Sequence, residues 1–167
     1  QKALFIIMNM IDGKYGTIYL VESNDLDEKI LRLCTGIGIP ESLIERFEYR
    51  PISPDFPSIV GESAYYNKTI IWTNAPETLR IEKVKKIFKN LNITDIITCP
   101  LSIQNEVIGV IQLSRGHNNH FSTSEKDLLE TFSIQLSVAI KEMEYRNELL
   151  VAKENSDYFL DLLCHDI

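Results

Sequence analysis

Apolar residues recur at two different spacings in the first part of the chain. At residues 3–10 they follow a helical period that stops before Asp12-Gly13, which predicts the last turns of a helix. Residues 17–21 are β-branched and aromatic, and residues 29–34 alternate apolar with polar side chains. Because turn-forming residues separate these two segments, we predict an antiparallel β-hairpin.

The middle of the chain alternates short helical and extended patterns. A helix is predicted for residues 41–47, directly after Pro40, and a second short helix from Ser58 onward. Residues 51–57 contain three prolines, which remove backbone donors and disfavour helical geometry in the preceding residue, so a loop is expected here. Residues 69–73 are rich in β-branched and aromatic side chains and predict a strand.

The pattern between residues 77 and 114 completes the predicted fold. Residues 77–91 place apolar side chains largely on one face and lysines on the other, which predicts one amphipathic helix. Residues 94–103 and 107–114 predict two strands joined by a polar turn of hairpin length. This order of elements is typical of an α+β fold, in which helices flank an antiparallel sheet.

A long helix is predicted at the end of the chain. Residues 122–124 offer hydroxyl N-caps, and Glu125 lies in the first turn, where the helix dipole favours a negative charge. Residues 125–167 contain neither glycine nor proline. A continuous helix of that length spans about 60 Å at 1.5 Å per residue, which is more than one globular domain needs.

The apolar repeat along this helix changes phase once. A seven-residue repeat is formed first by Leu129, Phe132, Leu136, Ala139 and Met143. A second stripe, displaced by one residue, is formed by Leu149, Ala152, Ser156, Phe159 and Leu163. We interpret the break near Arg146 as the boundary between a sensory domain, residues 1–146, and a coupling helix, residues 147–167.

Composition and charge argue against two classes of partner, nucleic acids and membranes. The chain has 167 residues, 44% of them apolar, and a formal net charge of −7, which suits one globular domain with an appendage. Because a negative chain repels a phosphate backbone, we expect no nucleic-acid partner. No apolar stretch approaches the roughly twenty residues of a spanning helix, so we expect a soluble segment without membrane contact.

Three cysteines indicate a reducing compartment. The chain has an odd number of cysteines, and they are widely spaced: Cys34, Cys99 and Cys164. This pattern argues against a disulfide framework and favours a cytoplasmic location. The first residue is not methionine, and residue 167 lies inside the periodic helical pattern. We therefore expect the chain to be a fragment of a longer protein.

In their order and spacing, these segments resemble a GAF domain over about residues 1–146. The resemblance is carried by residues 16–22, 61–65, 70–74, 99–101, 108–113, 121–130 and 135–140. GAF domains are ligand-sensing and dimerising modules, so the resemblance implies a homodimer through the terminal helices and a small-molecule pocket under the middle helices. The residues that it implies for this pocket are Phe56, Ile59, Tyr65, Trp72, Phe88, Cys99 and Gln112. Apolar residues at these spacings also fit a packed core, and Gln112 is the polar exception.

Two specialised GAF ligands are not expected. Members that bind cyclic nucleotides carry an Asn-Lys, Phe and Asp-Glu signature, of which this chain keeps only Phe121, with different residues at 114–115 and 125–126. Members that bind bilins carry a Cys-His pair on a helix inside the pocket. The Cys164-His165 pair lies about forty residues down the exit helix instead.

The end of the chain resembles the first residues of a histidine kinase dimerisation and phosphoacceptor domain. In that family a phenylalanine lies six residues before a helical histidine, which an acidic and an aliphatic residue follow, as at Phe159, His165, Asp166 and Ile167. The resemblance implies that His165 attacks the γ-phosphate of ATP and that Asp166 is the assisting carboxylate. ATP and a response regulator are implied only for the longer protein, because this chain has no nucleotide-binding motif.

The leading interpretation is a sensory input module of a two-component histidine kinase, which couples a ligand or redox state in the GAF pocket to autophosphorylation. One alternative is a free methionine sulfoxide reductase, which would depend on Cys34 and Cys99. Another is a ligand-free dimerisation module. A haem held by one of these cysteines is a further option. His117 and His120 have no third ligand nearby in sequence, so no metal site is expected.

Overall fold

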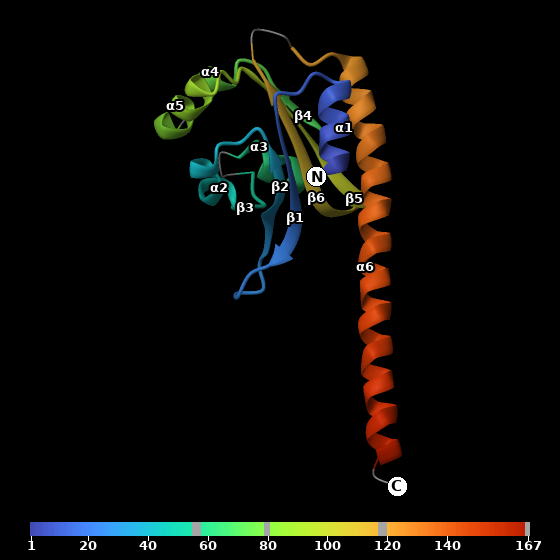
Figure 1. The fold of residues 1–167 in the computed structure, drawn as a ribbon. Helices are drawn as coiled ribbons and strands as arrows, with labels where there is room; N and C mark the ends of the chain where they lie inside the picture. The colour runs from blue at the N-terminus through green and yellow to red at the C-terminus, as the bar shows by residue number, and fades with distance from the viewer. Residues whose placement is uncertain (55–57, 79–80, 117–119, 166–167) are drawn as a thin grey trace.

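A six-stranded antiparallel sheet forms the centre of the computed structural model (Figure 1). The structure describes the backbone of residues 1–54, 58–78, 81–116 and 120–165, and the side chains of residues 1–54, 58–77, 81–116 and 120–156. The strand order is β3-β2-β1-β6-β5-β4. The elements are α1 (Lys2–Met10), β1 (Tyr15–Ser23), β2 (Lys29–Ile37), α2 (Glu41–Phe47), β3 (Tyr49–Pro51), α3 (Ile59–Tyr66), β4 (Ile70–Trp72), α4 (Ala75–Thr78), α5 (Glu82–Asn90), β5 (Asp95–Ile103), β6 (Glu106–Arg115) and α6 (Thr123–His165). The predicted α+β fold is confirmed.

Both predicted hairpins are present. β1 pairs with β2, and β5 pairs with β6 through a turn in which Gln104 and Asn105 have φ of 49° and 70°. Two consecutive residues with positive φ match the right-handed twist of the strands that they join. The register of β1 and β2 shifts after Ile18, where Cys34 is an extra, unpaired residue of β2. The hairpin that contains residues 17–21 and 29–34 therefore includes a β-bulge, which the alternation did not predict.

One face of the sheet is covered by α1 and α6 (Figure 1). Leu4, Ile7 and Met8 of α1 and Leu129 of α6 are buried against odd-numbered residues of β5 and against β1 and β6. Because α1 and α6 come from opposite ends of the chain, this layer brings the first residues beside the start of the long helix.

The other face carries α2, α3, α4 and α5 (Figure 1). A second core, which includes Tyr19, Ile59, Ile96 and Val110, lies on this side of the sheet. The prediction of one helix over residues 77–91 is wrong, because α4 and α5 are separate elements and Ile81 between them is extended, with φ −97° and ψ 108°. Residues 79–80 lie outside the described residues.

The start of α6 is stabilised by a reciprocal cap. The backbone N–H of Glu125 donates to the Ser122 hydroxyl at 3.3 Å, and the backbone N–H of Ser122 donates to the Glu125 carboxylate at 2.8 Å. Two otherwise unpaired helix donors are thereby satisfied. The predicted long helix is confirmed, with 43 residues from Thr123 to His165.

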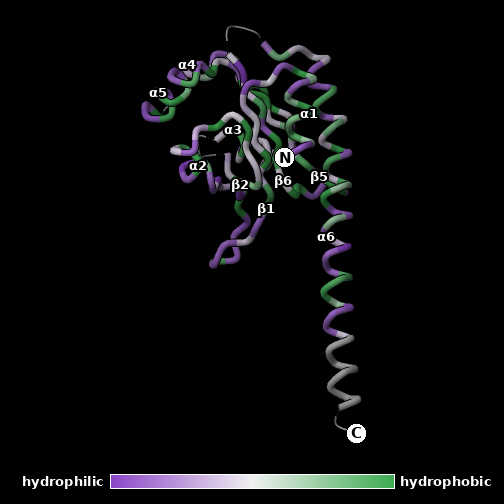
Figure 2. The backbone as a smooth tube through the Cα atoms, in the orientation of Figure 1, coloured by the Kyte–Doolittle hydropathy of each residue, from purple (hydrophilic) through white to green (hydrophobic). Residues whose placement is uncertain are grey.

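Only the first part of α6 packs against the sheet. Leu129 is fully buried and Phe132 and Leu136 are half-buried, whereas Met143 of the same predicted repeat is 62% exposed. Every described residue from Glu142 to Ser156 is exposed, and apolar and polar positions alternate along this stretch (Figure 2). Within the described residues, no helix combines the length and apolar character that a bilayer crossing requires.

Candidate functional site

A cavity of about 320 Å³ lies between the sheet and the layer of α2, α3 and α5. Its floor is formed by β1, β6 and β5, and its sides come from the α2–β3 segment, from α3 and from α5. This volume is near the lower end of the range of small-molecule sites. The lining residues are Tyr15, Gly16, Thr17, Tyr19, Ile39, Arg46, Phe47, Arg50, Ser58, Ile59, Val60, Trp72, Ile81, Lys83, Val84, Ile87, Phe88, Leu91, Ile93, Ile96, Gln112 and Ser114.

Strand alternation places two polar side chains side by side on the floor of the cavity. Thr17 on β1 lies opposite Gln112 on β6, and both face the cavity. Their neighbours Ile18 and Ile111 face the other way and pack under α1 and α6. The Thr17 hydroxyl is buried and has no hydrogen-bond partner in the part of the chain that the structure describes.

Close packing of α3 against β3 frames one side of the cavity. A Cβ atom added to Gly61 would lie 2.2 Å from the carbonyl oxygen of Pro51, so only glycine permits this approach. The Ser58 hydroxyl accepts a hydrogen bond from the Gly61 N–H at 3.3 Å and caps α3. These contacts hold Ile59, the first residue of the helix, against the cavity.

Arg50 on β3 is the most buried cation of the cavity lining. Its Nη1 donates to the carbonyl oxygens of Arg46 and Tyr49, at 2.8 Å each. The guanidinium lies 5.1 Å from the centre of the Phe47 ring, a cation–π contact. Burial lowers the pKa of Arg50, and the nearby Tyr19 partly opposes this shift.

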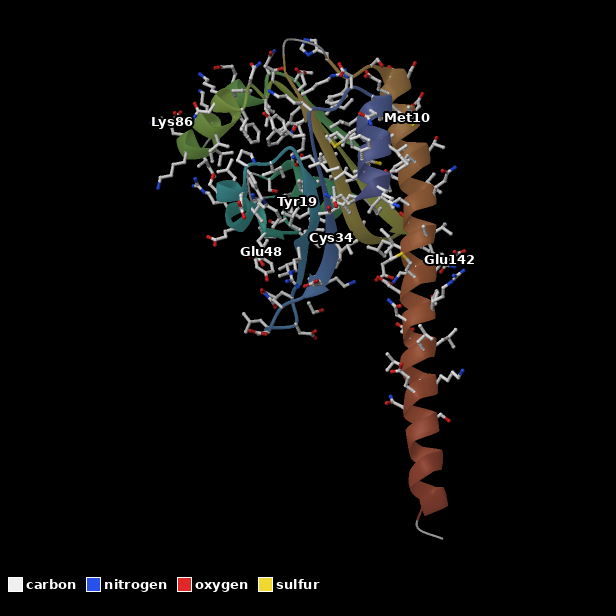
Figure 3. The ribbon with its side chains drawn as sticks, viewed as in Figure 1. Met10, Tyr19, Cys34, Glu48, Lys86 and Glu142 are labelled. Atoms are coloured by element: carbon white, nitrogen blue, oxygen red, sulfur yellow. The ribbon has the colours of Figure 1, made fainter. Side chains whose placement is uncertain are left out.

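Tyr19 lies in the middle of the domain, on the cavity face of β1 (Figure 3). Its side chain is 2% exposed, and this burial raises the pKa of the phenol. The positive charge of Arg50 acts in the opposite direction. Burial, the larger of the two effects, therefore favours the neutral phenol, whose hydroxyl can donate a hydrogen bond.

Four residues that the sequence placed in the pocket line this cavity. Ile59, Trp72, Phe88 and Gln112 come from α3, β4, α5 and β6, and the fold brings them together. Phe56 lies outside the described residues.

Tyr65 and Cys99 lie elsewhere. The buried side of α3 consists of Ile59, Val60, Ser63 and Ala64, so the helical period turns Tyr65 to the solvent, where it is 55% exposed. Cys99 is an odd-numbered residue of β5 and packs under α1 and α6, on the opposite face of the sheet. The same alternation places Ile96 in the cavity.

The two cysteines whose side chains the structure describes, Cys34 and Cys99, do not lie together. Cys99 is buried, it accepts a hydrogen bond from the Thr69 hydroxyl at 3.3 Å, and burial raises the pKa of its thiol. Cys34 is exposed on β2. Two strands separate β2 from β5, which at about 4.8 Å per step puts the cysteines roughly 14 Å apart. Their Cα atoms are too distant for a disulfide.

Arg50, Tyr19 and Thr17 are among the cavity residues that the sequence did not indicate. Thr17 and Tyr19 occupy alternate positions of a predicted strand, so polar atoms repeated on its inward face were an available signal. Arg50 gave no such signal, because it precedes a proline-rich segment and belongs to a strand of three residues.

The predicted phosphoacceptor lies far from the cavity. His165 is the last residue of α6, and its side chain and Asp166 lie outside the described part of the molecule. His120 contacts the buried Asp95, with 2.6 Å between Nδ1 and Oδ1, and His117 lies outside the described residues. Among the described residues, no group of three or more His, Cys, Asp or Glu side chains is arranged to hold a metal ion.

A sequence model described as GAF domain matches residues 1–141. No curated protein matches the chain in sequence. Solved structures match its fold: a GAF domain/HD domain protein from Geobacter sulfurreducens is 16% identical, with 86% of this chain and 90% of that chain covered and a TM-score of 0.68. A domain of a protein described as a two-component sensor histidine kinase, from Sinorhizobium meliloti 1021, is 17% identical, with 88% and 92% covered and a TM-score of 0.68.

A type II free methionine-R-sulfoxide reductase from Thermoplasma acidophilum has the same fold. It is 13% identical, with 85% of this chain and 89% of that chain covered and a TM-score of 0.64. Proteins with such different described functions share this architecture, so their similarity to this chain establishes its fold alone, and an activity has to be argued from the site.

Proposed function

The chain belongs to the GAF domain family, and we propose that it is the sensory input module of a two-component histidine kinase. In this proposal, a small molecule in the cavity changes the packing of the sheet against α6. The long helix then carries that change to His165, which accepts phosphate from ATP bound by a catalytic domain outside this chain. We also propose a cytoplasmic location and a response regulator as the recipient of the phosphate.

The observation that carries the proposal is that the cavity and α6 share one sheet. On β5, Ile96 lines the cavity, and its neighbour Ile97 packs in the core under α1 and α6. On β6, Gln112 and Leu113 have the same relationship. A ligand that shifts these strands would therefore change the surface on which α6 rests, because packed interiors transmit small displacements.

The path from the sheet to His165 is one continuous helix. The last residue of α6 that packs in the core is Ile140, and α6 continues to His165 without a break. Twenty-five residues at 1.5 Å each correspond to about 37 Å. A rigid element of this length can transmit a rotation, and the phase break that we predict near Arg146 offers two competing registers.

Phosphorylation of the longer protein tests this proposal directly. With radiolabelled ATP, the wild type should form an acid-labile, alkali-stable phosphohistidine, and His165→Gln should abolish it. Asp166→Asn should slow the reaction without changing the labelled residue. Lys153→Gln, an exposed substitution on the same helix, is the matched control and should leave labelling unchanged. Labelling that persists in His165→Gln would rule out this phosphoacceptor.

We further propose that two copies pair through α1 and α6. On α1, Phe5, Ile6 and Met10 are each more than half exposed, and on α6 Ile134 and Val138 are 65% and 50% exposed. These five side chains lie on the two helices that cover the same face of the sheet, a concentration of apolar surface typical of interfaces. Sedimentation equilibrium should give a dimer for the wild type and a shift toward monomer for Ile134→Glu.

The reductase alternative has less support. No cysteine occurs among the described residues that line the cavity, and Cys34 and Cys99 are on different strands, roughly 14 Å apart by strand spacing. The reductase alternative would be supported if the protein reduced free methionine sulfoxide with a thiol reductant and if Cys99→Ser removed that activity.

A further inference from the structure

The charged residues that line the cavity are all cations in the part of the chain that the structure describes. They are Arg46, Arg50 and Lys83, and no aspartate or glutamate lies among the described lining residues. The whole chain has the opposite bias, with 24 acidic and 17 basic residues. A basic cavity in an acidic protein favours a negatively charged ligand, because the local field concentrates anions there.

None of these three cations forms an ion pair with a described carboxylate. The ion pairs of the described residues use other bases, among them Lys85, which bonds Glu77 from the outer part of α5. Arg50 is the informative case, because it is half-buried and, among the described residues, its guanidinium contacts two backbone carbonyls and the Phe47 ring but no carboxylate. A partly buried charge without a counter-ion costs free energy that an anionic ligand would offset.

The geometry of Arg50 leaves its binding edge available. The hydrogen bonds to the carbonyl oxygens of Arg46 and Tyr49 both use Nη1 and occupy its two hydrogens. Nε and Nη2 have no partner among the described residues, and together they form the fork that matches a carboxylate. Since the carbonyls of Arg46 and Tyr49 hold the guanidinium in place, binding an anion would require little further ordering of this side chain.

The cavity floor supplies neutral hydrogen-bonding groups beside this cation. Thr17 is 3% exposed, its hydroxyl has no hydrogen-bond partner among the described residues, and its side chain lies on the same strand face as the Tyr19 phenol. A carboxylate that enters a buried site needs such donors for its remaining lone pairs.

Most of the remaining lining residues are apolar or aromatic. Trp72 and Phe88, together with Ile59, Val84 and Ile96, provide surface that a small inorganic anion would leave in contact with water. A ligand with an apolar body removes this surface from water, at roughly 25 cal/mol per Å². The occupant therefore needs a charged end and an apolar end.

We propose that the cavity binds a small organic carboxylate with an aromatic-sized apolar body, and that Arg50 holds its carboxylate. This inference rests on the proposed sensory role of the cavity and names the chemical class of its ligand. It also assigns to Arg50 the role of the specificity-determining residue, since a neutral isostere of the same shape would leave the guanidinium unpaired.

A matched pair of probes tests the proposal on residues 1–167. Phenylacetate and indole-3-acetate should raise the melting temperature and bind by calorimetry, whereas phenylacetamide and indole-3-acetamide should bind at least about ten-fold more weakly. Nitrate and phosphate should not compete with them. Equal binding of acid and amide, competition by nitrate or phosphate, or no binding of either acid at millimolar concentration would overturn the proposal.

Two substitutions of Arg50 test whether its positive charge binds the carboxylate of the ligand. Arg50→Gln should weaken the acids about ten- to a hundred-fold and leave the amides unchanged, and Arg50→Lys should restore part of the loss. Lys86→Gln, on the part of α5 that points away from the domain, is the control and should bind as the wild type does (Figure 3). Unchanged acid binding by a folded Arg50→Gln protein would overturn the assignment.

The proposed kinase function and the proposed ligand class can be contradicted independently of each other. If acids bind through Arg50 but leave phosphorylation of His165 unchanged, the ligand class stands and the coupling to the kinase is wrong. If His165 is phosphorylated and no carboxylate binds, the ligand class is wrong and the kinase assignment stands.

Discussion

Arg115 of β6 and Glu125 of α6 form a two-armed ion pair that attaches the long helix to the sheet. Arg115 Nη1 lies 2.6 Å from one carboxylate oxygen, and Nη2 lies 3.1 Å from the other. The guanidinium also donates to the carbonyl oxygens of Ile11 and His120 and lies 4.0 Å from the centre of the Phe121 ring. One nearly buried side chain therefore joins the end of α1, the sheet and the start of α6.

Replacement of Glu125 by glutamine should destabilise the domain by about 2 kcal/mol, because it leaves the Arg115 charge without its counter-ion and weakens the cap of α6. Thermal or urea unfolding measures this loss. Glu130→Gln is the matched control: Glu130 pairs with Lys126 at 3.3 Å, and both side chains are more than a third exposed. A change within about 0.5 kcal/mol is expected for that control.

The same ion pair predicts an acid-dependent loss of stability. The hydrogen bonds from Arg115 lower the pKa of Glu125 from 4.5 to about 2. A carboxyl group with a lowered pKa in the folded state stabilises that state above its unfolded pKa and loses this contribution as the pH falls toward the folded value. The stability difference between the wild type and Glu125→Gln should therefore be full at neutral pH and should shrink between about pH 5 and pH 2. A difference that stays constant across this range would contradict the ion pair.

Most of the fold could be predicted because its elements are locally encoded. Alternation at residues 29–34, the proline before α2 and the cap at Ser122 are all signals within a few residues of the elements that they define. The single predicted helix over residues 77–91 failed because its apolar periodicity runs on while Ile81 is extended in the fold. Periodicity alone does not detect such a break.

The cavity was harder to predict than the fold, because it depends on which face each residue takes. Gln112 lines the cavity whereas Cys99 lies on the opposite face of the sheet, and the face of each residue depends on the register of its strand. Arg50 enters the cavity through β3, whose three residues give too short a pattern to recognise. Contacts between distant segments determine these positions, and one sequence does not encode them locally.

Gly61→Ala should destabilise the domain by about 1–3 kcal/mol, although alanine normally favours a helix over glycine. The added Cβ would lie 2.2 Å from the Pro51 carbonyl oxygen and would push α3 away from β3. At Gly13 the nearest atom would be an ordinary 3.6 Å away, so Gly13→Ala should have little effect. Denaturation of the two variants tests this contrast. Equal stability of both would show that α3 is free to shift from β3.

Deletion of Asn147 should alter phosphorylation of His165 in the longer protein. The deletion lies where all described side chains of α6 are exposed, so it leaves the packing on the sheet intact. It rotates the helix beyond that point by about 100° relative to the domain. If the phase break near Arg146 is the switch, the kinase should become fixed in one state, with basal labelling changed at least about five-fold and no response to ligand.

An insertion of seven residues after Arg146 distinguishes an effect of helix rotation from an effect of helix length. Seven residues complete nearly two turns, so the downstream face returns to within about 20° of its original direction while the helix lengthens by about 10 Å. Transmission by rotation predicts that this variant keeps both basal labelling and the ligand response. If the insertion abolishes the response as fully as the deletion does, the helix does not signal by rotation. Near-normal behaviour of the deletion would exclude α6 as the coupling element, because no other described element leads from the sheet to His165.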